Sequence, residues 1–172
     1  MTAVLQTDRL ILRRPAPRDW DGFRDFAMSD RAAGIGGPHP ERIAWRVFCA
    51  ELGHWTMLGC GMWAVSAKGD DTARGLIGPW CPVDWPETEI GWMLWRQEDE
   101  GTGIAAEAAR AAIGHAWRVL GWETVVSYVG HDNPRSAALA RSLGASVDAS
   151  APQPNPDQPC LVYRHPRPGA RP

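Results

Sequence analysis

The sequence predicts an α/β fold of the α+β type, and three observations support this class. Three short apolar or alternating runs follow one another in the middle of the chain, separated only by turn residues, which is typical of an antiparallel meander. Two helical stripes precede the meander and a long alanine-rich helix follows it. The chain has 172 residues, of which 44% are hydrophobic and 22% are charged, as in ordinary globular proteins. We therefore expect a single domain over residues 1–172, with a core at about 5–165 and a frayed tail at 166–172.

The first part of the chain indicates one strand and two helices. Residues 5–14 are compact and apolar and end at a proline, which predicts a strand. Asp19 is placed to cap a helix over 20–28, where apolar residues recur at helical spacing. Residues 34–40 are rich in glycine and proline and predict a flexible loop. A second helical stripe then covers 41–58.

The central part changes from a helical period to an alternating one and back. Strands are predicted at 62–67, 74–80 and 88–95. After Gly103, apolar residues recur every three or four positions as far as Gly121. This sustained pattern predicts the longest amphipathic helix of the chain.

The last part predicts a strand, a helix and a final strand. Residues 124–129 are rich in β-branched side chains, and residues 134–143 form a helix with Asn133 as a cap candidate. The segment 149–159 carries four prolines and is expected to be an irregular loop before a short strand at 161–164. The predicted order of elements, from the first strand to the helix at 134–143, is therefore β-α-α-β-β-β-α-β-α.

Composition excludes several classes of function. The formal net charge of −2 and the pI near 6.2 leave no broad cationic field, so a nucleic-acid partner is not expected. No run approaches the roughly 20 apolar residues that span a bilayer, and the N-terminus lacks the apolar segment of a signal peptide, so we expect no membrane association and a cytoplasmic location. The cysteines are widely spread and none lies at zinc-ligand spacing, so we expect no metal site and four free thiols, at Cys49, Cys60, Cys81 and Cys160.

A glycine-rich turn between a strand and the longest helix is a candidate phosphate site. Gly101 and Gly103 stand where unpaired backbone N–H groups and the helix dipole both favour an anion. Glycine also allows positive φ and a close approach of backbone to ligand. Taken alone, this turn is equally well explained as a tight connection between strand and helix. A dinucleotide-binding site is poorly supported, because such a site follows a first parallel strand and this turn follows an antiparallel meander.

Four motifs occur in order and together resemble the GNAT superfamily of acetyltransferases: Glu89-Ile90-Gly91-Trp92, Glu100-Gly101-Thr102-Gly103-Ile104-Ala105-Ala106-Glu107-Ala108, Asn133-Pro134-Arg135-Ser136 and Leu143-Gly144. A segment near the start, Thr7-Asp8-Arg9-Leu10-Ile11-Leu12-Arg13, resembles more narrowly the branch that contains the ribosomal-protein alanine N-acetyltransferases. The likeness covers about residues 5–148. It implies a mixed, mostly antiparallel central sheet flanked by helices, in which two parallel strands, 88–95 and 124–129, splay apart at the cofactor site.

The resemblance also implies a co-substrate, acetyl-coenzyme A, and no metal. In the family, backbone amides of the glycine-rich loop hold the pyrophosphate, and the pantetheine arm enters between the splayed strands. Carried over to this sequence, the cofactor-binding residues are Met93, Leu94, Trp95, Glu100, Gly101, Thr102, Gly103, Ile104, Ala105 and Asn133.

Glu100 departs from the family pattern. The family's loop often starts with Gln or Arg at this place, and a carboxylate repels phosphate unless it points into solvent. Because backbone amides make the phosphate contact in the family, the departure is compatible with cofactor binding.

Acetyl transfer to an amine needs a base for the amine and a proton donor for the leaving thiolate. No Cys/His or Ser/His/Asp arrangement with motif context occurs, so direct attack in a ternary complex is preferred to an acyl-enzyme. By resemblance, Glu89 is the candidate general base. Glu87 lies two residues earlier and is its alternative, and a solvated strand-end carboxylate is the simpler explanation of either.

The asparagine motif supplies the other candidate catalytic residues. By resemblance, Asn133 lies near the pantetheine, although a helix cap would also explain it. Ser136 matches a serine proposed to protonate the departing thiolate, and an ordinary polar helix position is its alternative. Many family members use a tyrosine in this helix, where this chain has Ala140. Tyr128 and His131 lie nearby in sequence as possible substitutes.

The sequence leaves the acceptor and some alternatives open. Residues 34–40 and 80–87 are expected to flank the acceptor, which is a small-molecule amine or a protein N-terminus. Acidic side chains there would favour a cationic acceptor. A non-catalytic acyl-coenzyme A binding or sensing protein is the alternative function, and another acyl donor such as succinyl-coenzyme A is a further one. A monomer and a homodimer are both compatible with the sequence.

Overall fold

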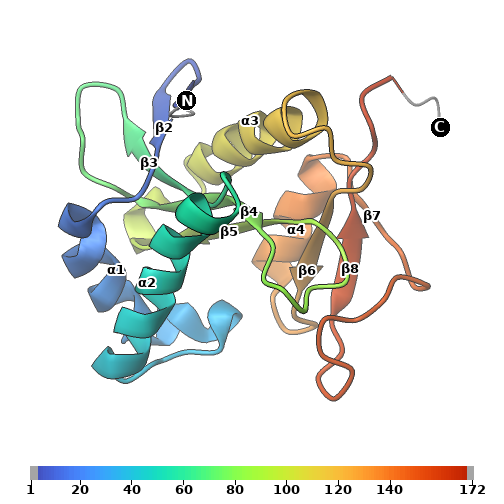
Figure 1. Ribbon diagram of the computed structural model, residues 1–172, viewed down its shortest axis with the longest axis horizontal. Helices are drawn as coiled ribbons and strands as arrows, with labels where there is room; N and C mark the ends of the chain where they lie inside the picture. Colours follow the sequence, from blue (N-terminus) through green and yellow to red (C-terminus); the bar gives the residue numbers. More distant parts are fainter. Residues whose placement is uncertain (1–3, 170–172) are drawn as a thin grey trace.

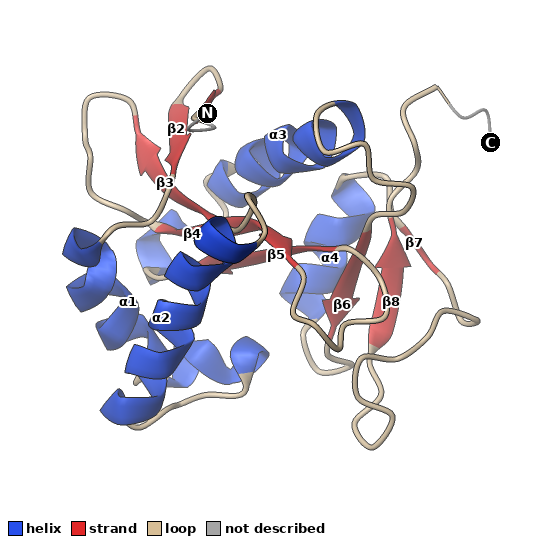
Figure 2. Cartoon of the chain, viewed as in Figure 1, coloured by secondary structure: helices blue, strands red, loops and turns tan. Residues whose placement is uncertain are grey.

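The computed structural model describes residues 4–169 and places its strands in one mixed sheet (Figures 1 and 2). The strand order is β1-β2-β3-β4-β5-β6-β8-β7, and every neighbouring pair is antiparallel except β5 and β6. The predicted α/β class is therefore confirmed. The strands are β1 (Leu5–Gln6), β2 (Leu10–Arg13), β3 (Trp63–Ala67), β4 (Gly75–Trp80), β5 (Glu89–Leu94), β6 (Val126–Val129), β7 (Ser146–Val147) and β8 (Leu161–Arg164).

Helices cover both faces of the sheet (Figure 1). One core cluster joins α3 to the strands, and a second joins α1 and α2 to them from the opposite face. The alternation of β5 shows this division, because Ile90 packs in the first cluster and Met93 in the second. The helices are α1 (Trp20–Ala27), α2 (Glu41–Met57), α3 (Ile104–Arg118) and α4 (Pro134–Ser142), and the short 3-10 helices are η1 (Pro17–Asp19), η2 (Asp30–Ile35) and η3 (Gln97–Asp99).

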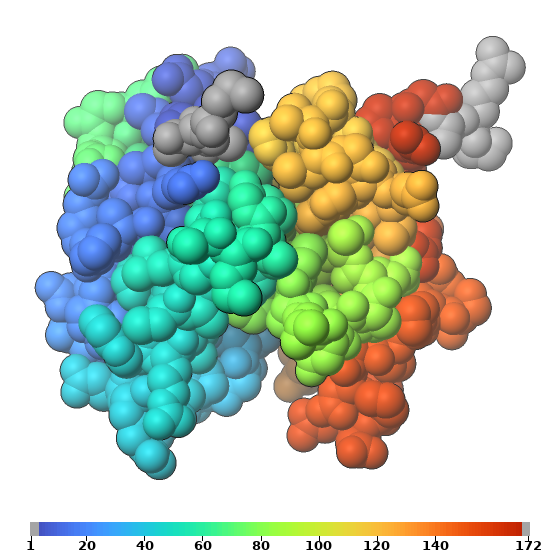
Figure 3. All heavy atoms as spheres, viewed as in Figure 1, coloured from blue at the N-terminus to red at the C-terminus, as the bar shows by residue number. Residues whose placement is uncertain are grey.

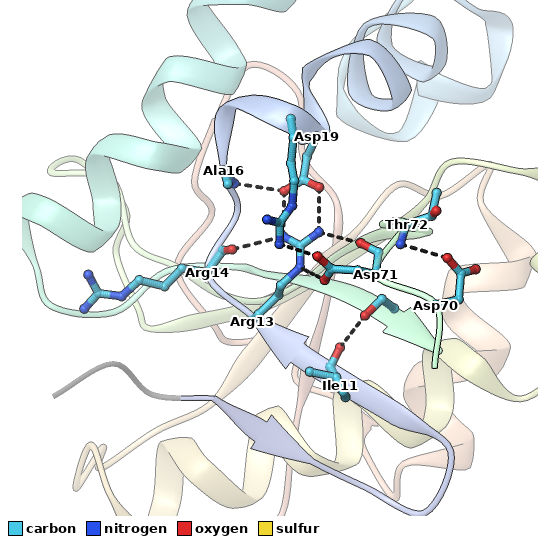
Figure 4. Close-up of polar contacts among 10 residues, drawn as sticks. Ile11, Arg13, Arg14, Ala16, Asp19, Asp70, Asp71 and Thr72 are labelled. Carbon is cyan, nitrogen blue, oxygen red and sulfur yellow. Dashed lines mark hydrogen bonds and ion pairs between the residues drawn. The ribbon is translucent and has the colours of Figure 1, made fainter. Parts of the chain in front are cut away.

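Two predictions for the N-terminal segment are wrong in detail. The strand expected at 5–14 is a hairpin of β1 and β2, because the chain turns where the amide of Thr7 bonds the carbonyl of Leu10. Asp19 makes no side-chain cap for α1. Its carboxylate instead accepts two bonds of 2.8 Å from Arg13 and one from the amide of Ala16 (Figure 4).

The ion pair between Arg13 and Asp19 fastens the N-terminal hairpin to the rest of the fold. Arg13 also binds Asp71 in the loop between β3 and β4, at 2.8 Å (Figure 4). In the pair of Arg13 with Asp19 both side chains are nearly buried, with exposures of 11% and 3%. A bidentate, desolvated pair of this kind leaves an uncompensated charge when one partner is removed, so it constrains the start of α1 more firmly than a cap would.

Other differences are local. The segment predicted as a flexible loop at 34–40 begins inside η2, which ends at Ile35, and contains a cis Gly37–Pro38 bond. The short edge strand β7 was not predicted, whereas β8 has the predicted bounds. Of the tail predicted to be frayed, residues 166–169 are exposed, yet Arg167 lies over the ring of Trp117, and residues 170–172 lie outside the described residues. One continuous sheet supports the expectation of one domain, which stays a prediction.

Candidate active site at the splayed strands

The parallel strands β5 and β6 are paired in register at only one position in the described structure. Glu89 is paired with Val126, and the amide of Val126 bonds the carbonyl of Thr88 at 3.0 Å. One residue further on, the Ser127 hydroxyl bonds the carbonyl of Ile90 at 2.6 Å, so a side chain replaces the backbone partner. The strands therefore diverge from Glu89 onwards, as the sequence predicts.

The glycine-rich loop lies beyond the end of β5 and leads into α3. Gly101 and Gly103 have φ values of 72° and 84°, which L side chains rarely adopt. Gly103 is the N-cap of α3 and provides no side-chain cap, so the first-turn amides are not bonded by a capping side chain. A Cβ added at Gly101 would meet nothing within 4 Å, so the backbone is open to an approaching group. This geometry fits a diphosphate bound by backbone amides.

Polar contacts on two sides hold the glycine-rich loop in place. Asp99 is 2% exposed and accepts a bond from Arg74 at 2.8 Å, and its carbonyl accepts the hydroxyl of Thr102 at 2.6 Å. On the opposite side, Arg9 donates to the carbonyl of Thr102 at 3.1 Å and pairs with Glu107 at 2.6 Å. The loop is thus fixed in the conformation that exposes its amides.

Glu100 does not extend freely into solvent. Its carboxylate pairs with Arg31 at 2.8 Å and with Arg135 at 2.5 Å. The sequence motif contained Arg135 but gave no sign of this pairing, and Arg31 stands 69 positions away in the chain. The carboxylate that departs from the family pattern is therefore compensated by two cations.

Of the other predicted cofactor residues, most contribute side chains to the core. Met93 and Trp95 pack in the cluster with α1 and α2, and Ile104, the first residue of α3, packs in the cluster of α3 and the strands. Leu94 presents its carbonyl to Arg31, at 3.1 Å. Any contact of the end of β5 with a ligand is therefore expected through its backbone. Ala105, the last residue of the predicted loop, lies in the first turn of α3.

Glu89 is a buried carboxylate at the point where the strands part. It is 8% exposed, and the indole of Trp85 donates to its Oε2 at 2.6 Å. Burial raises the pKa of Glu89 to about 7, although the bonds from Trp85 and from the backbone of Tyr128 act in the opposite direction. A carboxylate with this pKa exchanges protons near neutral pH, which suits a general base.

Glu87, the alternative base, has a different environment. Its carboxylate binds Arg164 at 2.8 and 3.0 Å and accepts the hydroxyl of Thr124 at 3.0 Å. These contacts lower the pKa of Glu87. It also lies before the first residue of β5, so the strand alternation that would have aligned it with Glu89 does not apply.

A second buried carboxylate, Glu51, was not predicted as a site residue. It is 1% exposed on α2, and its Oε2 has no hydrogen-bond partner in the described part of the chain. Burial and the charge of Glu89 raise the pKa of Glu51 to about 8. A signal was present, because Glu51 stands between Phe48 and Trp55 at helical spacing on the buried face of α2.

The pKa of Glu51 predicts a measurable pH dependence of stability. The ordinary value is 4.5, so between about pH 4.5 and 8 the unfolded chain ionises at this residue while the folded protein stays protonated. Stability is therefore lost as pH rises through this window. Glu51→Gln is expected to remove the loss, so that its free energy of unfolding relative to the native sequence increases by about 1–4 kcal/mol from pH 5 to pH 8. Urea unfolding at several pH values measures this difference.

The control for this prediction is Glu41→Gln, at an exposed position on the same helix. Its effect on stability is expected to be the same at pH 5 and pH 8. A pH-independent difference for Glu51→Gln as well would show that Glu51 is ionised in the folded protein.

Asn133 and Ser136 form the start of α4. The Oδ1 of Asn133 accepts the amide of Ser136 at 3.0 Å, so the expected helix cap is present. The hydroxyl of Ser136 accepts the indole N–H of Trp92 at 3.1 Å. Because a hydroxyl has one hydrogen to donate and here uses its oxygen as acceptor, that hydrogen is available to another group.

Aromatic side chains surround Glu89. Trp80 is its partner across β4 and β5 and stacks on His54, with ring centroids 4.4 Å apart. Trp85 meets Tyr128 edge to face, and the buried hydroxyl of Tyr128 has no partner among the described residues. In Figure 3 the surface is hollowed between α2, in teal, and the green segment at 81–88, which precedes Glu89 in the chain.

The remaining candidates are not part of this cluster. Ala140 is fully buried in α4, and the side chain of His131 is exposed. Between residues 4 and 169, no group of three or more His, Cys, Asp or Glu side chains is arranged to hold a metal ion. None of the helices in this part of the chain has the length and apolar character needed to cross a bilayer.

Comparisons with known proteins agree with this geometry. A family model described as an acetyltransferase (GNAT) domain matches residues 9–146. The crystal structure of an acetyltransferase from Agrobacterium tumefaciens is 39% identical, with a TM-score of 0.89 over 96% of this chain and 95% of that chain. A protein from Bordetella pertussis described as a GNAT-family acetyltransferase is 27% identical, with a TM-score of 0.76 over 95% and 99%. The RimL ribosomal alpha-N-protein acetyltransferase is 16% identical, with a TM-score of 0.73 over 96% and 94%, and shares the fold.

Proposed function

The chain belongs to the GNAT acetyltransferase family, and on this basis we propose that it transfers an acetyl group from acetyl-coenzyme A to a primary amine by direct attack in a ternary complex. The single observation that carries the proposal is the position of Glu89, which is a buried carboxylate at the one residue pair by which β5 and β6 are in register in the described structure. A base at this place lies where the acetyl donor and the acceptor would meet.

The co-substrate would be held by backbone groups. The amides at the start of α3 carry no side-chain cap and follow the open backbone of Gly101, and they would bind the diphosphate. The gap between β5 and β6 would admit the pantetheine arm beside Trp92 and Ser136. When bound, acetyl-coenzyme A supplies a thioester carbonyl for attack and a thiolate leaving group.

Glu89 takes the proton that the attacking amine must lose. Since an ordinary alkyl amine is protonated at neutral pH, the base must compete for that proton, and a pKa of about 7 matches this task better than that of an exposed carboxylate. The bond from Trp85 fixes the carboxylate, and the protonated Glu51 lies close enough for the charge of Glu89 to raise its pKa. The ionised form of Glu89 favours a cationic acceptor.

Ser136 is the proposed proton donor to the leaving sulfur. Ser136→Ala is expected to lower kcat by about 10²–10³-fold, which is the lower part of the range for general acid catalysis, and to leave the acceptor KM within about twofold. Steady-state kinetics with saturating acetyl-coenzyme A measures this effect. Ser142→Ala, at the exposed C-terminal end of the same helix, is the control. A kcat unchanged in both variants would leave thiolate protonation to solvent.

Mass spectrometry tests the function and the acceptor class together. The protein is incubated with acetyl-coenzyme A and a library of small amines and peptides with free N-termini, and products are identified by the added acetyl group. Acetylated products that require the protein support the proposal. Binding of acetyl-coenzyme A by calorimetry without product across the library would instead favour an acyl-coenzyme A sensor.

A further inference from the structure

Three charged side chains from different parts of the chain meet at the glycine-rich loop. Glu100 begins the loop, Arg31 comes from η2, and Arg135 comes from the first turn of α4. Each guanidinium binds one oxygen of the Glu100 carboxylate, Arg31 at Oε1 and Arg135 at Oε2. Two cations and one anion leave a local excess of one positive charge beside the backbone amides of the loop.

Arg31 is held at the end of β5, where the sheet has opened. Its Nε donates to the carbonyl of Trp95 and its Nη2 to the carbonyl of Leu94, both at 3.1 Å. These bonds place the guanidinium beside the first residue of the loop. With a side-chain exposure of 26%, it is accessible to a ligand there.

Arg135 approaches the same place from the other side of the opening. Its side chain is 77% exposed, so most of its donors face solvent. The elements that carry the two arginines also lie close together, because a Cβ added to Gly34 of η2 would be 3.3 Å from Nδ2 of Asn133, the N-cap of α4. The two guanidinium groups therefore lie where η2, the start of α4 and the glycine-rich loop come together.

We propose that Arg31 and Arg135 bind phosphate groups of the coenzyme A moiety, and that Glu100 holds both guanidinium groups beside the glycine-rich loop until the ligand takes its place as their partner. This inference rests on the proposed function, which puts the same ligand at the loop. A phosphate offers more charge and more acceptor oxygens than a carboxylate, and the planar guanidinium binds it in bidentate geometry. The loop itself begins with an acidic residue, so the cations that would bind the phosphate come from η2 and α4 instead.

Calorimetric titration of acetyl-coenzyme A into single variants tests the proposal without relying on activity. Arg31→Gln and Arg135→Gln are each expected to raise Kd by about tenfold, because each removes a charge-assisted contact. Glu100→Gln is expected to lower Kd by about threefold, because it removes a competing and repelling carboxylate. Arg24→Gln is the control, since Arg24 also bridges two carboxylates, Asp21 and Asp25, away from the loop.

The opposite signs of the arginine and glutamate variants separate ligand binding from a bracing role. If the ion pairs only brace the loop, Glu100→Gln and Arg135→Gln would weaken binding together, and that result would overturn the proposal. Unchanged Kd values in both arginine variants would overturn it as well. If the native protein itself does not bind acetyl-coenzyme A, the proposed function fails with it, whereas native binding with unaffected variants removes this inference alone.

Two shortened ligands identify which phosphate is bound. Acetyl-dephospho-coenzyme A keeps the diphosphate and lacks the 3′-phosphate, and acetyl-pantetheine lacks both. A penalty for Arg135→Gln that persists with the first ligand and vanishes with the second supports a diphosphate contact. A penalty that already vanishes with the first ligand supports a 3′-phosphate contact. A penalty that persists with acetyl-pantetheine would contradict phosphate binding by this residue.

Discussion

Glu89→Gln is expected to lower kcat/KM for the amine acceptor by about 10²–10⁴-fold at pH 8, because glutamine cannot accept the amine proton. Glutamine retains an oxygen that can accept the indole N–H of Trp85, so the local geometry is expected to persist. The Kd of acetyl-coenzyme A, measured by calorimetry, is expected to stay within about twofold, since the substitution removes a group that acts on the acceptor.

The pH profile of the native protein gives an independent readout of the same residue. Below its pKa of about 7, Glu89 is protonated and cannot act as base, so kcat/KM is expected to rise as pH increases through about 7. In Glu89→Gln this rise disappears and only the ionisation of the amine remains.

The matched control for Glu89 is Glu87→Gln. This substitution breaks the contacts with Arg164 and Thr124, so it is expected to cost about 1–2 kcal/mol of stability and to leave kcat/KM and its pH profile unchanged. The assignment of Glu89 as the base would be contradicted if the rise of kcat/KM through about pH 7 disappeared in Glu87→Gln. It would also be contradicted if the rise remained in Glu89→Gln.

Gly101→Ala is expected to raise the Kd of acetyl-coenzyme A by about 10–100-fold. The added methyl group lies in the open space where the diphosphate approaches, and the loss of one hydrogen bond to a charged group is worth roughly 1.5–3 kcal/mol. The positive φ of 72° adds a stability cost of about 1–2 kcal/mol, which thermal or urea unfolding measures separately.

Gly121→Ala separates the two effects, because Gly121 lies just beyond the other end of α3. Its φ is 66°, and a Cβ there would also meet nothing within 4 Å. The two alanine variants are therefore expected to lose similar stability, and only Gly101→Ala to lose affinity. Equal affinities in both variants would show that the loop is not the diphosphate site.

The environment of Glu89 also bears on the acceptor. The expected acidic surface is smaller than the sequence indicated, because Glu87 is neutralised by Arg164. The aromatic pairs Trp80 with His54 and Trp85 with Tyr128 border the remaining carboxylate. These surroundings would suit an acceptor whose amine is attached to an apolar or aromatic group better than an acceptor that carries additional positive charges.

Secondary structure was largely readable from the sequence wherever a segment is long or its ends are marked. Helix α3 follows from the sustained apolar repeat after Gly103, and β8 follows from an apolar run after a proline-rich loop. These are one-dimensional signals, since the period of apolar residues reports which face of an element is buried. The hairpin of β1 and β2 was missed because its turn carries no glycine or proline.

The sequence by itself determined the class of the fold, the family resemblance and the glycines of the loop, since backbone conformation and motif order are local properties of the chain. Only the tertiary structure decided which charges are neutralised and which are buried. Glu87 and Glu89 are two residues apart, yet one binds Arg164 and the other lies in an apolar site that raises its pKa to about 7. Likewise, Glu100 has Arg31 and Arg135 as partners. The physical reason is that solvation and ion pairing depend on neighbours distant in sequence, and no local pattern encodes them.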